Sequence, residues 1–183
     1  PDAARQANRM ERLVRDLLRL ARLEGGQEPV EPLPTDVEAL FGDLVIELEG
    51  ALDAKDQRVV TDVGPEAASL LVDTAKLHDA LRNLVENAVA YAPPATTITL
   101  ASRRDGGEVV ITVADEGPGI PEVDLARVFE RFYRVDKARS RESGGTGLGL
   151  AIVKHLVEIL GGDVKAANRP EGGALFTVRL PAR

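Results

Sequence analysis

The sequence predicts an α+β fold, a two-layer α/β sandwich in which helices cover one face of a mixed, largely antiparallel sheet. Long segments with apolar residues at helical spacing alternate with short runs rich in β-branched residues. Most of these runs are joined in pairs by hairpin turns such as RRDGG, whereas parallel strands need a longer crossover. With 183 residues, of which 44% are hydrophobic, the chain is long enough to bury a core.

The N-terminal segment, RQANRMERLVRDLLRLARLEGG, is predicted to be a helix that ends at Gly25-Gly26. Met10, Leu13, Leu17 and Leu20 follow the heptad spacing of a coiled-coil seam. One helix cannot bury its own apolar stripe, so the stripe needs a partner. Two partners remain open, a dimeric helical bundle, which we favour, and the domain that follows.

A proline-rich polar stretch, GQEPVEPLP, follows this helix and is typical of a linker. We therefore divide the chain into a helix over 1–26, a linker over 27–34 and a domain over 35–183. The chain begins without Met in charged, helix-forming residues, so we expect it to belong to a longer protein.

The elements of the domain are predicted from caps and chain breakers. Thr35 and Glu38 form a capping box before an amphipathic helix over 37–48. A long helix ends at Pro93-Pro94, and the last helix ends at Gly161-Gly162. The remaining predicted ranges are strands at 58–63, 69–73, 97–102, 108–115, 163–168 and 174–181, and helices at 74–92, 122–132 and 147–160.

Composition excludes several classes of function. The chain has no cysteine, which excludes disulfides, thiolate metal sites and a thiol nucleophile, and fits a reducing compartment. The net charge of −7 argues against a general nucleic-acid binder. No apolar run approaches the length of a membrane span, and the N-terminus lacks a signal-peptide pattern.

The long helix over 74–92 carries an unusual polar side. At about 100° per residue, Asn83, Glu86 and Asn87 lie opposite the apolar side that runs from Leu77 to Ala88. A face that only meets solvent would favour Lys, Glu, Arg or Gln over two mid-helix asparagines. Amide and carboxylate oxygens suit a hard cation such as Mg²⁺, so a metal site is one interpretation and a solvated face the other.

The stretch DEGPGI directly follows a predicted strand. A carboxylate at Asp115 can accept a hydrogen bond from an exocyclic amine such as that of adenine. Gly117 and Gly119 would let the backbone pass close to a flat ligand. An ordinary turn would also explain this stretch when it is taken alone.

The stretch RESGGTGLGL places four glycines directly before an apolar helix. Such a segment presents unpaired N–H groups and the positive end of a helix dipole, and phosphate oxygens can approach it closely. Thr146 can add a hydroxyl, and a flexible linker is the alternative. Arg131, Arg134, Lys137 and Arg139 lie between this segment and DEGPGI and could meet phosphates. Together, the three features predict a site for a purine nucleotide.

In this order, the motifs NLVENA, DEGPGIP, FERFYR and GGTGLGL resemble the nucleotide-binding boxes of bacterial sensor histidine kinases, and GGALFTVRLP resembles the closing strand of that domain. RMERLVRDLLRLARLEGG resembles the second helix of their dimerisation and histidine-phosphotransfer hairpin. The run ERFYRVDKARSR is most similar to the phosphate-regulon sensor type. The resemblance covers nearly the whole chain and implies the ATP-binding sandwich shared with gyrase, Hsp90 and MutL, preceded by one helix of a dimeric four-helix bundle.

The resemblance also implies roles for single residues. Asn87 would bind Mg²⁺ with Asn83 nearby, and Asp115 would hold the adenine amino group. Related ATPases carry a water-activating glutamate at the position of Asn83, and because an amide is no general base, this favours phosphoryl transfer over hydrolysis. Glu86 is given a supporting role, and a mobile lid is expected over 132–146. The predicted catalytic residues are Asn83, Glu86 and Asn87; the predicted cofactor-binding residues, for ATP and Mg²⁺, are Asn83, Asn87, Tyr91, Asp115, Gly117, Gly119, Ile120, Phe132, Arg134, Lys137, Gly145, Thr146, Gly147, Leu148, Gly149 and Leu150.

The chain departs from this family pattern at two points. The family often has Lys or Arg three residues after the metal-binding asparagine, where this chain has Ala90. His78 and His155 are its two histidines, and both lie on helices of the sandwich outside the acidic context expected of a phosphoacceptor. We therefore expect both to be structural and the acceptor histidine to be absent from this chain.

The resemblance implies transfer of the ATP γ-phosphoryl group to a histidine and then to an aspartate of a response regulator. The expected partners are a second copy, through the N-terminal helix bundle of the intact protein, and the cognate regulator, but no nucleic acid. Membrane contact is expected only through upstream segments, which would make this the cytoplasmic portion of an anchored sensor. The alternatives are a degenerate nucleotide-binding or dimerisation module, and an anti-sigma-type serine kinase, which would lack the N-terminal helix.

Overall fold

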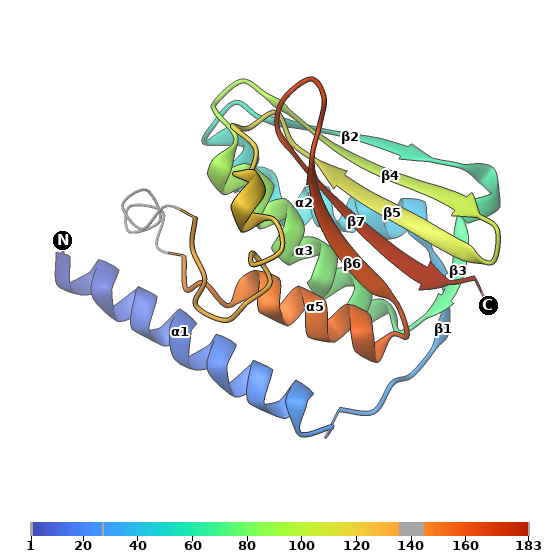
Figure 1. Ribbon diagram of the computed structural model, residues 1–183, viewed down its shortest axis with the longest axis horizontal. Coiled ribbons are helices and arrows are strands. Elements are labelled where there is room, and N and C mark those ends of the chain that lie inside the picture. The colour runs from blue at the N-terminus through green and yellow to red at the C-terminus, as the bar shows by residue number, and fades with distance from the viewer. Residues whose placement is uncertain (1, 27, 136–144, 183) are drawn as a thin grey trace.

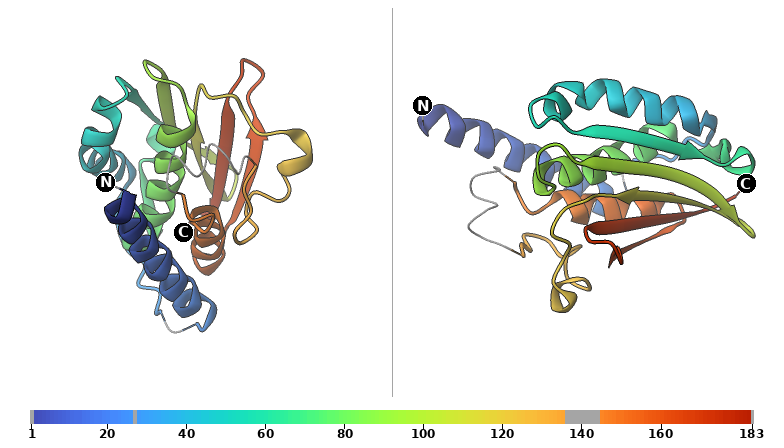
Figure 2. Two further views of the ribbon diagram at one scale, coloured as in Figure 1. Left: turned by 90° about the vertical axis from the view of Figure 1, so that its left-hand side faces the viewer. Right: turned by 90° about the horizontal axis from the view of Figure 1, so that it is seen from above.

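The computed structural model describes residues 2–26, 28–135 and 145–182 (Figure 1). One long helix, α1 (Asp2–Glu24), lies along the outside of a two-layer domain, beside the helix α5 (Gly149–Ile159). The two views in Figure 2 show the same arrangement from the side and from above.

A five-stranded sheet forms one layer of the domain. Its strand order is β2-β4-β5-β7-β6, with β2 and β4 parallel and the other neighbours antiparallel. Along the central strand β5, Val109, Ile111 and Val113 are buried and alternate with half-buried residues. The predicted mixed sheet is therefore confirmed. The strands are β2 (Arg58–Val63), β4 (Thr97–Asp105), β5 (Glu108–Ala114), β6 (Asp163–Asn168) and β7 (Ala174–Pro181).

The second layer consists of α2 (Val37–Asp53), α3 (Thr74–Tyr91) and α5, which share one hydrophobic core with the inner face of the sheet. The apolar side predicted for α3 is the buried side, since Leu77, Leu81 and Leu84 have no exposed surface. Burial of a leucine contributes about 1.5–3 kcal/mol, so this stripe fixes the rotation of α3 and leaves its asparagines on the other side.

The apolar stripe of α1 is divided between two surroundings. Leu20 and Leu23 are buried in the domain core, and Leu13 packs against it. Met10 and Leu17, the other row of the predicted seam, are exposed. Packing on the following domain thus accounts for one row of the stripe, while the second row stays on the surface of this chain.

The region predicted as a linker contains a strand. β1 (Leu33–Asp36) pairs antiparallel with β3 (Ser69–Val72) in a separate two-stranded sheet. β1 therefore begins at Leu33, inside the range 27–34 that we predicted as a linker. Because Leu33 lies between Pro32 and Pro34, the sequence shows no alternation there that would reveal a strand. A short 3-10 turn, Pro65–Ala67, connects β2 to β3.

The predicted capping box was also wrong. Asp36, not Thr35, is the N-cap of α2, and its Oδ1 accepts from the N–H of Ala39 at 3.0 Å. Thr35 lies in β1 instead, where its hydroxyl contacts the hydroxyl of Thr74 at the start of α3. Strand pairing with β3 therefore takes Thr35 out of the capping position.

The helix predicted over 122–132 is replaced by a 3-10 turn at Glu122–Asp124 and further turns. Val128 is buried, and the ring of Phe129 meets the ring of Phe176 edge-on with centroids 6.3 Å apart. Phe132 has a φ of +61°, which no helix continues. Packing of Val128 and Phe129 and the turn at Phe132 hold this segment against the domain, so it does not form a continuous helix.

Asp73 caps the start of α3 and ties it to the preceding chain. Its carboxylate accepts from the N–H of Lys76 at 3.1 Å, the ammonium of Lys76 at 3.0 Å and the N–H of Glu31 at 3.1 Å. Burial by itself raises the pKa of Asp73, but these hydrogen bonds and the Lys76 charge outweigh burial and lower the pKa below its usual value.

We expect Asp73→Ala to lower the free energy of unfolding by about 1–2 kcal/mol at pH 7, because the cap of α3 is lost. A lowered folded-state pKa stabilises above the unfolded value, about 3.9, and this stabilisation disappears as the pH falls through the folded pKa. Urea unfolding at pH 7 and at pH 3 measures both effects, and the difference between wild type and variant should shrink at pH 3. A difference that stays constant would contradict the role of the charge.

Candidate functional site

The carboxylate of Asp115 is fixed where β5 ends. Asp115 is 5% exposed, and its Oδ1 accepts from the N–H of Gly117 at 2.7 Å and from the N–H of Ala174 at 3.1 Å. Its own N–H donates to the carbonyl of Ala174 at 3.0 Å. Within the described parts of the chain both side-chain contacts go to Oδ1, which leaves Oδ2 as an acceptor. The result is a buried carboxylate whose orientation is fixed by two N–H groups.

Two glycines make room for this carboxylate. A Cβ on Gly117 would lie 2.8 Å from Oδ1 of Asp115, and one on Gly173 would lie 1.9 Å from the carbonyl oxygen of Asp115. Gly173 also has a φ of +96°, a conformation that favours glycine. Gly117 was expected in the site, whereas Gly173 was not. Its position in a Pro/Gly turn gave no sign that the turn closes on Asp115.

Asn168 holds the loop that follows Asp115. The N–H of Ile120 donates to Oδ1 of Asn168 at 2.7 Å, and Nδ2 of Asn168 donates to the carbonyl of Ile120 at 2.7 Å. Gly119 has a φ of +75° and a Cβ there would lie 2.7 Å from Oδ1 of Asn168. Arg169, the next residue, donates to the carbonyl of Asp115 at 2.8 Å. The end of β6 thus supports the loop at two points, which the sequence alone did not predict.

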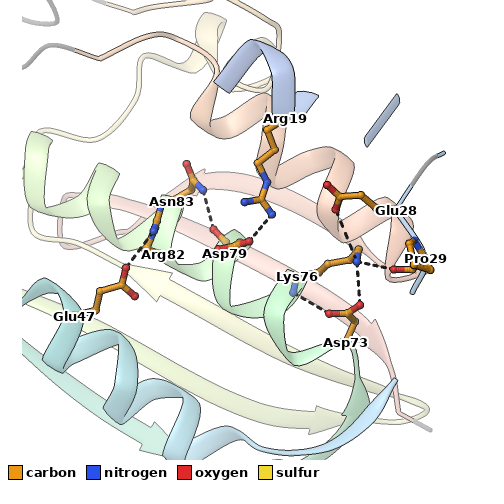
Figure 3. A network of polar contacts seen from close by, with 9 residues as sticks. All are labelled: Arg19, Glu28, Pro29, Glu47, Asp73, Lys76, Asp79, Arg82 and Asn83. Atoms are coloured by element: carbon orange, nitrogen blue, oxygen red, sulfur yellow. Dashed lines mark hydrogen bonds and ion pairs between the residues drawn. The ribbon is translucent and has the colours of Figure 1, made fainter. Parts of the chain in front are cut away.

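The polar side of α3 carries Asn83, Glu86 and Asn87. Nδ2 of Asn83 donates to the carbonyl of Asp79 one turn earlier at 2.8 Å, so its Oδ1 is directed away from that turn (Figure 3). A Cβ on Gly149 would lie 3.1 Å from this Oδ1. Asn87 is half-buried, while Glu86 is exposed and lies 3.6 Å from Nε of Arg82. The amide oxygen of Asn83, in the middle of α3, therefore lies beside Gly149 at the start of α5.

The glycine-rich segment is described from Gly145 onward. It leads into α5 through Gly147, whose φ is +76°. A Cβ on Gly147 would lie 3.0 Å from Cα of Phe132, and the N–H of Phe132 donates to the carbonyl of Gly147 at 2.9 Å. Arg134 donates to the carbonyl of Gly145. Lys137 and Arg139 lie outside the described residues, as do 136–144 of the expected lid.

These segments meet around α3. The position of a Cβ on Gly117 is 3.5 Å from Cα of Ala92 and 3.5 Å from the carbonyl of Tyr91, at the end of α3. The start of α5 meets the middle of α3 at Asn83. The Asp115 loop and the glycine-rich segment therefore border the same helix, and Asn87 lies between Asn83 and Tyr91 along it. Leu148 is fully buried, whereas Ile120 and Leu150 are partly buried, and Tyr91 is exposed.

The two histidines lie beside carboxylates on other elements. Nε2 of His78 is 3.2 Å from Glu47 of α2, and Nε2 of His155 is 3.2 Å from Glu24 of α1. Both side chains thus take part in contacts between helices. Ala90 is exposed on α3 and supplies no charge to the site.

Comparisons of the sequence with known proteins all indicate relatives of histidine kinases. Residues 72–183 match the model of the histidine kinase-, DNA gyrase B- and HSP90-like ATPases. The chain is 41% identical, over 97% of its length, to the sensor-like histidine kinase SenX3 of Mycobacterium tuberculosis and covers 43% of that protein. It is 38% identical, over 94% of its length, to the phosphate regulon sensor protein PhoR of Pseudomonas aeruginosa and covers 39% of it. The chain therefore spans less than half of these relatives.

A solved structure gives the same likeness in three dimensions. Full-length ShkA in complex with AMPPNP superposes with a TM-score of 0.83 at 32% identity, covering 98% of this chain and 37% of that one. No helix in the part of the chain that the structure describes is long and apolar enough to cross a membrane.

We expect Asn168→Ala to loosen the loop over 115–121, because both hydrogen bonds to Ile120 are lost. Amide exchange at Ile120 should become about tenfold faster, while the free energy of unfolding falls by only about 1 kcal/mol. Exchange followed by mass spectrometry or NMR measures the first effect and urea unfolding the second. Asn168→Asp, which keeps the acceptor for the Ile120 N–H, should restore part of the protection. Unchanged exchange in Asn168→Ala would show that the loop holds itself.

Proposed function

The chain belongs to the histidine kinase-, DNA gyrase B- and HSP90-like ATPase family, and from this premise we propose that it is the ATP-binding catalytic part of a bacterial sensor histidine kinase. The proposal rests on three features that border α3. The carboxylate of Asp115 is held near the end of α3, amide oxygen lies on the polar side of α3, and the glycine-rich start of α5 contacts its middle. The relatives named as sensor kinases and the complex of ShkA with AMPPNP support it.

The adenine of ATP is read by Asp115 in this proposal. Oδ1 is held by two N–H groups, so Oδ2 accepts from the exocyclic amine. Gly117 and Gly119 bring the backbone of the loop to the flat base, and Asn168 keeps the loop in place. Because the acceptor is buried and oriented before binding, little order is lost when adenine enters.

The phosphates lie at the glycine-rich segment and the start of α5. N–H groups of Gly145, Gly147 and Gly149 and the positive end of the α5 dipole attract them. Asn87 and Asn83 suit Mg²⁺, which prefers oxygen ligands and few protein groups, since Nδ2 of Asn83 is held by Asp79 and its Oδ1 is turned toward Gly149. When bound, the ion would neutralise phosphate charge.

The polar side of α3 favours transfer of the γ-phosphoryl group to a protein over hydrolysis of ATP. Asn83 is an amide and cannot take a proton from water. Glu86 is exposed and forms an ion pair with Arg82, which also donates a hydrogen bond to Glu47. We therefore assign Glu86 a supporting role through its ion pair with Arg82. The side chain at position 83 therefore does not activate water for attack on the γ-phosphate. An incoming neutral imidazole attacks the γ-phosphorus with the lone pair of one ring nitrogen. The bond from the γ-phosphorus to the β,γ-bridging oxygen breaks, ADP leaves, and the proton on the other ring nitrogen is released to solvent.

The acceptor histidine is supplied by another segment in this proposal. His78 and His155 pair with Glu47 and Glu24 and keep a structural role. We assign α1 as the second helix of a dimerisation and phosphotransfer hairpin. Its exposed apolar residues, Met10, Val14, Leu17 and Leu18, fit a second copy and the first helix of such a hairpin. An aspartate of a response regulator receives the phosphoryl group afterwards.

We expect Asp115→Asn to raise the Kd for ATP at least tenfold, because the amide either loses the Gly117 contact or presents an N–H to the adenine amine. Fluorescence titration or calorimetry measures the affinity. The matched control is Asp62→Asn, which changes an exposed carboxylate on β2 that pairs with Arg103 on β4 and should bind like wild type. An unchanged affinity in Asp115→Asn would remove the adenine assignment.

Transfer is tested with Mg-ATP labelled on the γ-phosphate and a separately produced hairpin that carries the acceptor histidine. We expect acid-labile, base-stable label on the hairpin, and at least a tenfold lower rate for Asn87→Ala, because an oxygen ligand is lost. Lys165→Ala, at an exposed position three residues before Asn168 on β6, is the control. Nucleotide binding without any transfer would instead support a nucleotide-binding module without transferase activity.

A further inference from the structure

The helix α1 reaches the glycine-rich segment. Oδ2 of Asp16 accepts a hydrogen bond from the hydroxyl of Thr146 at 2.7 Å, and both residues are half-buried. Thr146 lies between Gly145 and Gly147, in the segment to which the proposed function assigns the phosphates. A carboxylate from outside the domain therefore touches the phosphate-binding segment.

The Thr146 hydroxyl cannot serve this carboxylate and a phosphate together. Its oxygen accepts from the N–H of Leu148 at 3.3 Å, and the hydroxyl has only one proton to donate. Ionised carboxylates and phosphates only accept hydrogen bonds. The two groups also repel each other when they approach within a few ångströms. Asp16 and a nucleotide phosphate are thus alternatives at Thr146.

Asp16 is held there by the packing of its helix. Leu20 and Leu23, one and two turns further on, are buried in the core. Arg19 pairs with Asp79 of α3 (Figure 3). After the helix ends, the ammonium of Lys76 donates to the carbonyl of Pro29 at 2.8 Å and fixes the direction of the connecting chain. The contact at Thr146 therefore belongs to a docked helix.

The C-terminal end of α1 makes a second contact of this kind. Glu24 pairs with Arg131, a cation that precedes the glycine-rich segment and was expected near the phosphates. The same carboxylate lies 3.2 Å from Nε2 of His155 on α5. Docked α1 thus engages both a hydroxyl and a guanidinium that phosphates would otherwise attract.

We propose that docking of α1 and binding of nucleotide phosphates oppose each other, with Asp16 as the group that competes for the Thr146 hydroxyl. This inference rests on the proposed function, because it needs phosphates at the glycine-rich segment. By linkage, the factor by which docked α1 weakens nucleotide binding equals the factor by which nucleotide weakens docking. Nucleotide binding then frees α1 from the segment, and docked α1 holds the site in its lower-affinity state.

The test compares the Kd of the β,γ-imido analogue of ATP with Mg²⁺ for wild type, for two single variants of α1, and for Thr146→Val with and without the Asp16 change. We expect Asp16→Ala to lower the Kd about fivefold, since the competitor for Thr146 is removed. Glu11→Ala, a carboxylate of the same helix that pairs with the exposed Arg15, should bind like wild type. In a Thr146→Val background the Asp16→Ala effect should fall below about twofold, because the contested proton is absent.

A second measurement reads the linkage from the other side. Saturating analogue should speed amide exchange over the α1 residues 10–23 in wild type and have a smaller effect in Asp16→Ala. Equal Kd values for Asp16→Ala and wild type, or a weaker Asp16→Ala, would overturn the inference while leaving the proposed function intact. Failure of all variants to bind the analogue would overturn the proposed function itself.

Discussion

The site depends above all on the pairing of β5 with β7. Ala114 lies opposite Leu175, and the next step of the pairing places the N–H and carbonyl of Ala174 against Asp115. The missing side chain of Gly173 allows this approach. A shift of one residue between the two strands would turn the buried row of β5 outward and remove the donor from the carboxylate. Formation of the sheet therefore also positions the buried carboxylate of Asp115.

The remaining groups of the site divide between side chains and main chain. The helix α3 contributes amide oxygens, whereas the segment before α5 contributes N–H groups made accessible by glycine. This division suits a ligand that is flat at one end and multiply charged at the other, because each end meets a different type of donor or acceptor. The buried leucines of α3 keep the two parts in a fixed relation.

Much of this arrangement was predictable from local patterns. Helical periodicity located α1, α2, α3 and α5, and alternation with hairpin turns located most strands. Asp115 and Gly117 were predictable because they directly follow a strand and lie within one short motif. Gly173 and Asn168 were not, because their roles arise from contacts with Asp115 and Ile120 across the sheet. The capping residue of α2 was misassigned because β1 is too short to show its period, and the Asp16 contact joins residues 130 positions apart.

The helix α3 is attached to the rest of the chain at both of its ends. At its start, Lys76 donates a hydrogen bond to the carbonyl of Pro29, and the carboxylate of Asp73 accepts one from the N–H of Glu31. The chain that follows α1 is therefore attached to the first turn of α3. At its last turn the same helix adjoins the Asp115 loop. A displacement of the connecting chain that moves the start of α3 would therefore also move its other end, beside the Asp115 loop.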